Sequence, residues 1–172
     1  MAIATIGMSS GKWAADFVTD DSSGSISFLA GIVTGDVNSD SGSYVGKDAY
    51  GWSIFGNTGN KYNNEIGSAY GSKFTSANQM RVEFDADNGD LFFFVDDVIY
   101  NSGTAAFTGL TDGPYFFAFS SHSSNFSVNF GQLGGLNDTP TAGYLELNTA
   151  NLPAPTILDG TANFQPTLYT GD

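Results

Sequence analysis

The alternation of hydrophobic and polar positions is clearest in the middle of the chain, where it predicts strands rather than helices. Residues 81–85 alternate charged and apolar side chains, so one face of this strand is apolar and the other is charged. Residues 91–95 are apolar throughout, as expected for a strand that is covered on both faces. Residues 98–100 are again apolar and predict a third, short strand.

Two turn signals join these three strands. Asn88-Gly89 predicts a two-residue type I′ turn, because both central positions of that turn need φ > 0. Asp96-Asp97 predicts a second tight turn, which sends the chain back antiparallel to the strand before it. The three strands therefore form an antiparallel meander. The other predicted strands need this meander to pair or pack against.

The other hydrophobic segments are short and lie between stretches rich in glycine, serine and asparagine. Gly31 falls inside one of them and indicates a bulge or a point of close packing. No long window shows helical periodicity. We expect further strands over residues 2–6, 12–19, 26–33, 50–55, 115–120 and 126–130, and a hairpin region over 56–71. This pattern predicts an all-β sandwich with many turns.

The character of the sequence changes at Gly131. The residues after it hold four of the five prolines and few periodic apolar positions. We therefore divide the chain into a β-sandwich over residues 1–132 and an extended, proline-containing C-terminal arm over 133–172. The arm is expected to wrap the sandwich or to reach a neighbour, because a disordered tail would carry fewer apolar anchors. The expected anchors are Tyr144, Leu145, Leu152, Ile157, Phe164 and Tyr169.

Charge and composition narrow the function classes. The chain has 172 residues, which suit one domain, and a formal net charge of −13 with only five lysines and arginines. Such a charge disfavours nucleic acid and anionic membranes as partners, and its simplest explanation is solubility in salty surroundings. Without cysteine there is no disulfide or thiol chemistry. The N-terminus lacks the features of a signal peptide, no apolar run can span a bilayer, and we expect no cofactor.

Catalytic candidates are few. A glycoside hydrolase built on a sandwich would place two carboxylates on one strand face, and Glu83 and Asp85 have the spacing for that. No further acidic pattern accompanies them, so we interpret them as solvated carboxylates on the outer face of the meander. His122 is the only histidine, and we interpret it as an ordinary loop residue. The chain is therefore expected not to be an enzyme.

One acidic loop has some features of a calcium site. Asp36, Asn38 and Asp40 offer oxygen ligands at alternating spacing. The bidentate glutamate that would complete a calcium loop is absent, because Lys47 stands in its place. We therefore expect no metal and interpret the loop as acidic and solvated, with calcium as the alternative.

The candidate binding surface is aromatic. Several aromatic residues lie in or beside loops rich in glycine and asparagine, where rings and amide groups together can hold a sugar or the edge of a protein. The candidates are Tyr44, Tyr50, Trp52, Asn60, Tyr62, Asn63, Asn64 and Tyr70. The alternative is that Tyr50 and Trp52, two apart on one strand, belong to the core or to a sheet face.

Several segments resemble, in order, those of the SPRY family. They are GKWAADFVTD, DAYGWSIFGNTGNKYNN, FDADNGDLFFFVDD, AFTGLTDGPYFFAFS and SVNFGQ, and the resemblance covers residues 2–132. It implies a bent antiparallel β-sandwich, similar to the concanavalin-like jelly rolls, that serves as a binding scaffold without catalysis. Only MAIATIG precedes the first segment, where SPRY domains usually have one or two strands. The chain is then a shortened version, or a neighbouring subunit supplies the missing edge.

The segment GYLELNTANLPAPTI resembles the one that follows SPRY domains in tailed-phage and related metagenomic proteins. This resemblance implies a non-enzymatic phage virion structural protein, a capsid- or tail-associated decoration or fibre subunit located in the virion. Its expected partners are other virion proteins or copies of itself. The alternative is a carbohydrate-binding module that recognises host surface glycans. A third hypothesis is a degraded glycanase.

Overall fold

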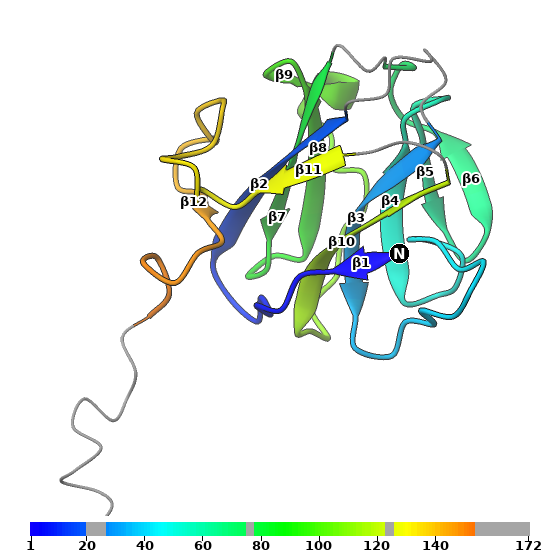
Figure 1. The fold of residues 1–172 in the computed structure, drawn as a ribbon, viewed down its shortest axis with the longest axis horizontal. Helices are drawn as coiled ribbons and strands as arrows, with labels where there is room; N and C mark the ends of the chain where they lie inside the picture. The colour runs from blue at the N-terminus through cyan, green and yellow to red at the C-terminus, as the bar shows by residue number, and fades with distance from the viewer. Residues whose placement is uncertain (20–26, 75–77, 123–125, 154–172) are drawn as a thin grey trace, which may run out of the picture.

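In the computed structural model, which describes residues 1–19, 27–74, 78–122 and 126–153, two β-sheets pack face to face (Figure 1). Sheet A has the order β1 (Ala2–Ile3), β10 (Tyr115–Ser121), β3 (Phe28–Thr34), β4 (Gly51–Phe55), β5 (Asn60–Asn63) and β6 (Ile66–Ala69). Sheet B has the order β11 (Phe126–Asn129), β2 (Lys12–Thr19), β7 (Gln79–Asp85), β8 (Asp90–Val95) and β9 (Val98–Ile99), and β12 (Leu145–Glu146) also pairs with β2. A 3-10 helix, η1 (Tyr100–Gly103), follows β9. The predicted all-β, antiparallel sandwich is confirmed. No helix among the described residues is long and apolar enough to cross a membrane.

The core lies between the two sheets and is largely aromatic. Because side chains alternate between the faces of a strand, every second residue of each central strand points into this space. The Phe84 ring of sheet B meets the Tyr115 ring of sheet A edge to face, with centroids 5.1 Å apart. Such contacts add to the gain from burial, which is about 2–3 kcal/mol for a fully buried phenylalanine. The residues that join the sheets include Phe17, Ile32, Ile54, Phe84, Phe93, Tyr115 and Phe117.

The central meander forms as predicted, but its first turn differs from the prediction. Asp85 pairs with Asp90, which leaves four residues in the β7–β8 loop instead of two. The Asp85 carboxylate accepts the backbone N–H groups of Asp87 and Asn88 at 3.1 and 3.2 Å. Gly89, at φ 73°, closes the loop by donating to the Asp85 carbonyl. The type I′ prediction was therefore wrong, because the side chain of Asp85 organises a longer turn.

The second turn is the tight one. Val95 pairs with Val98, so only Asp96 and Asp97 lie in the loop, and their φ values are 50° and 62°. Both central residues are therefore left-handed, as a type I′ turn requires. This prediction is confirmed.

Gly31 is a point of close packing, as expected. A Cβ at this position of β3 would lie 1.9 Å from the carbonyl oxygen of Trp52 in β4, so no side chain fits there. The glycine allows the two central strands of sheet A to pair closely.

Part of the C-terminal arm wraps sheet B. β12 pairs in parallel with the start of β2, while β11 pairs with its end, so together they cover one edge of β2. Leu147, which was not among the predicted anchors, is 2% exposed and belongs to the core. Leu145 is 48% exposed and is not an anchor, whereas Leu152 packs on the core. Ile157, Phe164 and Tyr169 lie outside the described residues, and the boundary after residue 132 stays a prediction.

Tyr144 also anchors this segment. Its ring lies 5.6 Å from Nζ of Lys12, and burial raises the pKa of its hydroxyl. The contact connects the arm to the first residue of β2.

The arm also covers the charged face of the meander, which we had expected to meet solvent. Arg81 and Glu83 are 2% and 1% exposed, and Asp85 is 3% exposed. Glu83 pairs with Arg81 at 2.9 Å and accepts the backbone N–H of Thr141 at 2.8 Å. The interpretation of Glu83 and Asp85 as solvated was therefore wrong. Alternation along a strand shows which residues share a face, but not which distant segment covers that face.

The N-terminal edge of sheet A is occupied by the chain itself. Ala2 and Ile3 pair with Phe119 and Ala118, and Met8 forms a further bridge to Tyr115. The first residues of the chain thus run along β10. Over this length the edge of β10 is paired with residues of the same chain and not with a strand from a neighbouring subunit.

Candidate functional site

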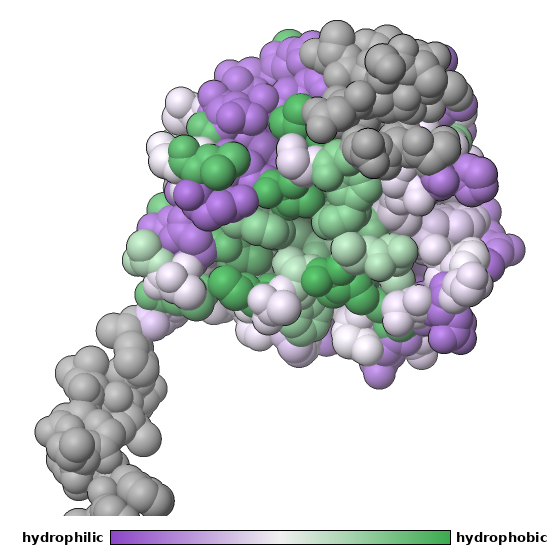
Figure 2. Space-filling view, viewed as in Figure 1, coloured by the Kyte–Doolittle hydropathy of each residue, from purple (hydrophilic) through white to green (hydrophobic). Residues whose placement is uncertain are grey.

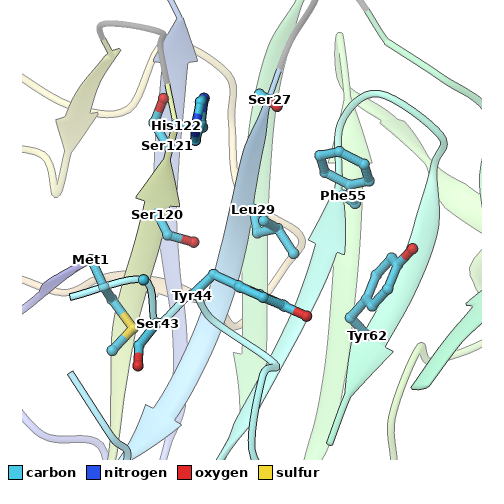
Figure 3. A pocket seen from close by; sticks show the side chains of 11 residues that line it. Met1, Ser27, Leu29, Ser43, Tyr44, Phe55, Tyr62, Ser120, Ser121 and His122 are labelled. Atoms are coloured by element: carbon cyan, nitrogen blue, oxygen red, sulfur yellow. The ribbon is translucent and has the colours of Figure 1, made fainter. Parts of the chain in front are cut away.

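A groove of about 500 Å³ lies on the outer face of sheet A. Figure 3 shows the Tyr44 ring lying across β3 below Leu29, with its hydroxyl directed toward Tyr62. We call this hollow the sheet-A groove. It is lined by Met1, Ser27, Leu29, Gly42, Ser43, Tyr44, Phe55, Tyr62, Ser120, Ser121 and His122.

The loop that carries Tyr44 is fixed to the sheet by buried polar contacts. The backbone N–H of Val45 donates to Oγ of Ser120 at 3.2 Å, and Oγ of Ser53 donates to the Val45 carbonyl at 2.6 Å. Val45 itself is fully buried. Because both neighbouring strands hold the loop, Tyr44 is positioned before any ligand arrives, which lowers the entropic cost of binding.

Partial burial changes the chemistry of Tyr44. It raises the pKa of the hydroxyl, and the nearby Glu65 and Tyr62 act in the same direction. The hydroxyl therefore stays neutral at physiological pH and serves as a hydrogen-bond donor or acceptor. Nζ of Lys47 lies 6.0 Å from the ring, so a cation stands beside this aromatic face.

The far wall of the groove is formed by two aromatic rings from neighbouring strands. Phe55 and Tyr62 meet edge to face with centroids 6.1 Å apart. Tyr62 is paired across the strands with Gly67, and a Cβ on Gly67 would lie 2.7 Å from the Tyr62 ring. The glycine of β6 therefore makes the space in which the Tyr62 ring lies.

Opposite these rings the lining is polar and mostly uncharged. Ser120 and Ser121 end β10, and the backbone N–H of His122 donates to the Ser27 carbonyl at 3.0 Å. None of the described residues that line the groove carries a carboxylate. The groove therefore offers aromatic surface and hydroxyl groups, a combination suited to binding.

The structure separates the predicted aromatic residues. Tyr44 and Tyr62 come together in the groove. Trp52 points into the core, where its ring lies 5.6 Å from that of Tyr115, in agreement with the alternative interpretation. Tyr70 is 8% exposed and its hydroxyl donates to the Thr104 carbonyl at 2.7 Å; burial raises its pKa to about 12. Tyr50 is 47% exposed and lies outside the groove.

The predicted asparagines do not line the groove. Nδ2 of Asn63 donates to the Gly51 carbonyl at 2.8 Å and so connects β5 to β4. Asn64 has φ 53° and forms a two-residue turn with Glu65. Asn60 pairs with Phe55 at the start of β5. The structure thus shows mainly structural contacts for these three residues.

The acidic loop uses several of its polar groups internally. Oδ1 of Asn38 accepts the backbone N–H of Asp40, and the Asp48 carboxylate accepts the N–H groups of Asn38 and Tyr50. Within the described part of the chain, no group of three histidine, cysteine or acidic side chains is arranged to hold a metal ion. The loop of Asp36, Asn38 and Asp40 therefore has internal hydrogen bonds, and the expectation of no metal, with calcium as its alternative, stays a prediction.

Sequence reasoning missed Leu29, Phe55 and the serine side of the groove. Leu29, Phe55 and Ser120 lie on the outer face of sheet A. The sequence could have shown this for Phe55, because it lies three residues beyond Trp52 and so on the opposite face of β4. His122 was assigned to a loop, and it lies at the end of the groove.

These features define a class of protein: a β-sandwich with an aromatic groove on the outer face of one sheet. A family model described as SPRY domain matches residues 17–133, and the chain belongs to the SPRY family. SPRY domains are generally non-catalytic modules for protein interaction. The matched residues include all of the groove lining except Met1. No curated protein matches the chain.

Proposed function

We propose that this chain is a non-enzymatic attachment protein of a phage particle, and that it holds a protein partner in the sheet-A groove. The observation that carries the proposal is the preformed groove of Tyr44, Phe55 and Tyr62 on a SPRY sandwich. The resemblance of residues 143–157 to segments of tailed-phage proteins supports the virion as the location.

The shape and chemistry of the groove favour a short peptide segment. Leu29 and Phe55 give it an apolar floor and wall, which suit an aliphatic or aromatic side chain of the partner. The partly exposed serines of the lining, Ser27 and Ser43, can pair with the partner's backbone groups. A volume of about 500 Å³ accommodates a few side chains, so the contact is a local anchor.

The test is sedimentation of the labelled chain with purified particles of its source phage. We expect the wild-type chain to sediment with the particles and the Phe55→Ala chain to lose at least tenfold in affinity, since the wall of the groove is removed. Tyr50→Ala is the matched control, because Tyr50 is aromatic and exposed but lies outside the groove. Equal binding by the wild type and Phe55→Ala, or no sedimentation of the wild type, would contradict the proposal.

A glycan is the second candidate ligand, because the exposed face of Tyr44 lies beside serine hydroxyls, as in many sugar sites. Binding of the wild type to immobilised host surface glycans, lost in Tyr44→Ala and kept in Tyr50→Ala, would favour this alternative.

A further inference from the structure

A second hollow lies on another side of the sandwich, where the edges of the two sheets meet. It has a volume of about 250 Å³ and is lined by Ile3, Ala4, Thr5, Ile6, Phe130 and Leu147. We call this hollow the apolar seam. Figure 2 shows hydrophobic residues gathered over the middle of this face, where β1 and β11 lie in Figure 1.

The seam is continuous with the core. Ile6 and Phe130 pack on the buried cluster, and the Phe130 ring lies 6.2 Å from that of Phe117. Leu147 is buried, while Ile3 is 38% exposed. The seam is therefore a place where the sandwich is incompletely covered, and covering it would remove apolar surface from water.

One wall of the seam also offers backbone groups to a further strand. The N–H of Ala4 donates to the Phe117 carbonyl at 2.8 Å, so Ala4 faces β10. By strand alternation the backbone groups of Ile3 and Thr5 point the other way, away from β10. An extended segment laid along β1 would meet them as a neighbouring strand.

The last described segment of the chain meets this seam at Leu147, six residues before residue 153. Leu147 lines it, Leu152 packs on the core, and the described residues stop at residue 153. Residues 154–172 follow directly. At about 3.3 Å per residue this segment can extend roughly 60 Å, several times the length of β1 or β11.

The composition of residues 154–172 fits an apolar, uncharged seam. The segment contains only two charged side chains, Asp159 and Asp172, and none of the six residues that line the seam is charged. Its apolar and aromatic residues are Ile157, Leu158, Phe164, Leu168 and Tyr169, together with alanines and prolines. Because the segment follows Leu147 of the seam by only six intervening residues, its effective concentration there is on the order of millimolar, which favours the chain's own segment over a free partner.

We infer that residues 154–172 dock in the apolar seam of their own chain and complete the sandwich between β1 and β11. This docking is independent of the sheet-A groove. It leaves that groove free for a partner while it covers the incompletely buried side of the core.

Photo-crosslinking in the full chain tests the proposal. A benzophenone amino acid placed at Ile3, which is partly exposed at the seam, is expected to form crosslinks that mass spectrometry maps to residues 154–172 of the same chain. The control carries the same group at Val98, which is 64% exposed on β9, and is expected to give no such crosslink. Crosslinks from position 3 that avoid residues 154–172, or that join two chains, would overturn the proposal.

Hydrogen exchange supplies an independent measurement. In the variant Ile157→Asp/Phe164→Asp/Tyr169→Asp the amides of residues 3–6 are expected to exchange at least tenfold faster than in the wild type. The matched control, Thr156→Asp/Asn163→Asp/Thr167→Asp, adds the same charge at polar positions and is expected to change exchange less. Equal rates in the wild type and the first variant would overturn the proposal. Binding in the sheet-A groove is measured separately with Phe55→Ala.

Discussion

The buried carboxylate of Asp16 should make the stability of this protein fall as the pH rises through the weakly acidic range. Asp16 lies in β2 beneath the C-terminal segment and is 0% exposed. Its Oδ2 accepts the backbone N–H of Asn137 at 2.7 Å, while its Oδ1 is buried without a hydrogen-bond partner among the described residues. Burial raises its pKa from 3.8 to about 6, although Asn137 and Arg81 favour the charged form.

The sign and size of the effect follow from the two pKa values. Between pH 3.8 and about 6 the folded chain binds a proton at Asp16 that the unfolded chain has released. Asp16 therefore stabilises the folded state most at low pH, and this contribution is lost as the pH rises through about 6. The shift corresponds to about 3 kcal/mol in full, of which about 1.4 kcal/mol falls between pH 5 and pH 8.

The perturbation that isolates this effect is Asp16→Asn, which keeps an acceptor for the Asn137 N–H and removes the titration. Urea unfolding of the wild type and the variant, followed by tryptophan fluorescence at pH 5 and pH 8, gives two differences in unfolding free energy. We expect the variant to gain about 1.4 kcal/mol relative to the wild type between pH 5 and pH 8. Asp40→Asn, which removes the same charge from an exposed loop, should show a much smaller change. The reasoning is refuted if Asp16→Asn and the wild type keep a constant difference.

Two further predictions concern single contacts. Leu147→Ala should lower the free energy of unfolding in urea titrations by about 3 kcal/mol, because Leu147 is buried in the core. The control, Leu145→Ala, changes an exposed position of the same segment and should alter this free energy by less than about 1 kcal/mol. Glu65→Gly should raise the melting temperature by a few degrees, which corresponds to about 1 kcal/mol of unfolding free energy. The reason is that Glu65 has φ 61° in its turn, a conformation that glycine adopts without strain. A lower melting temperature would contradict this prediction.

Local patterns predicted the strands well because their causes are local. The tight turn at Asp96-Asp97 follows from residues that lie next to each other in one turn, and Gly31 indicates by its own missing side chain that another strand approaches closely. The β7–β8 turn was predicted with the wrong length because Asn88-Gly89 is only part of its signal. The Asp85 carboxylate accepts two backbone N–H groups of the loop and so stabilises the longer turn.

The sequence could not show what covers each sheet. Residues 136–147 reach Asp16 and Glu83 from the distant end of the chain, through backbone N–H groups that any residue except proline supplies. Their sequence carries no periodic pattern, and only Leu147 contributes a buried apolar side chain. For the same reason the sheet-A groove was predicted in part. Tyr44 and Tyr62 were identified as aromatic loop or hairpin residues, but the strand register that places Phe55 beside them is a tertiary feature.

The two outer faces of the sandwich differ in a way that bears on where a partner binds. The outer face of sheet B carries Asp16, Arg81 and Glu83, and leaving such groups buried without partners would cost several kcal/mol. The C-terminal segment donates backbone N–H groups to one carboxylate oxygen of Asp16 and one of Glu83, so a partner that displaced this segment would have to replace those contacts. The outer face of sheet A carries Leu29, Phe55 and Tyr62 around a groove that none of the described segments fills. A partner that binds in the sheet-A groove, as we propose, therefore leaves the contacts of the C-terminal segment with sheet B in place.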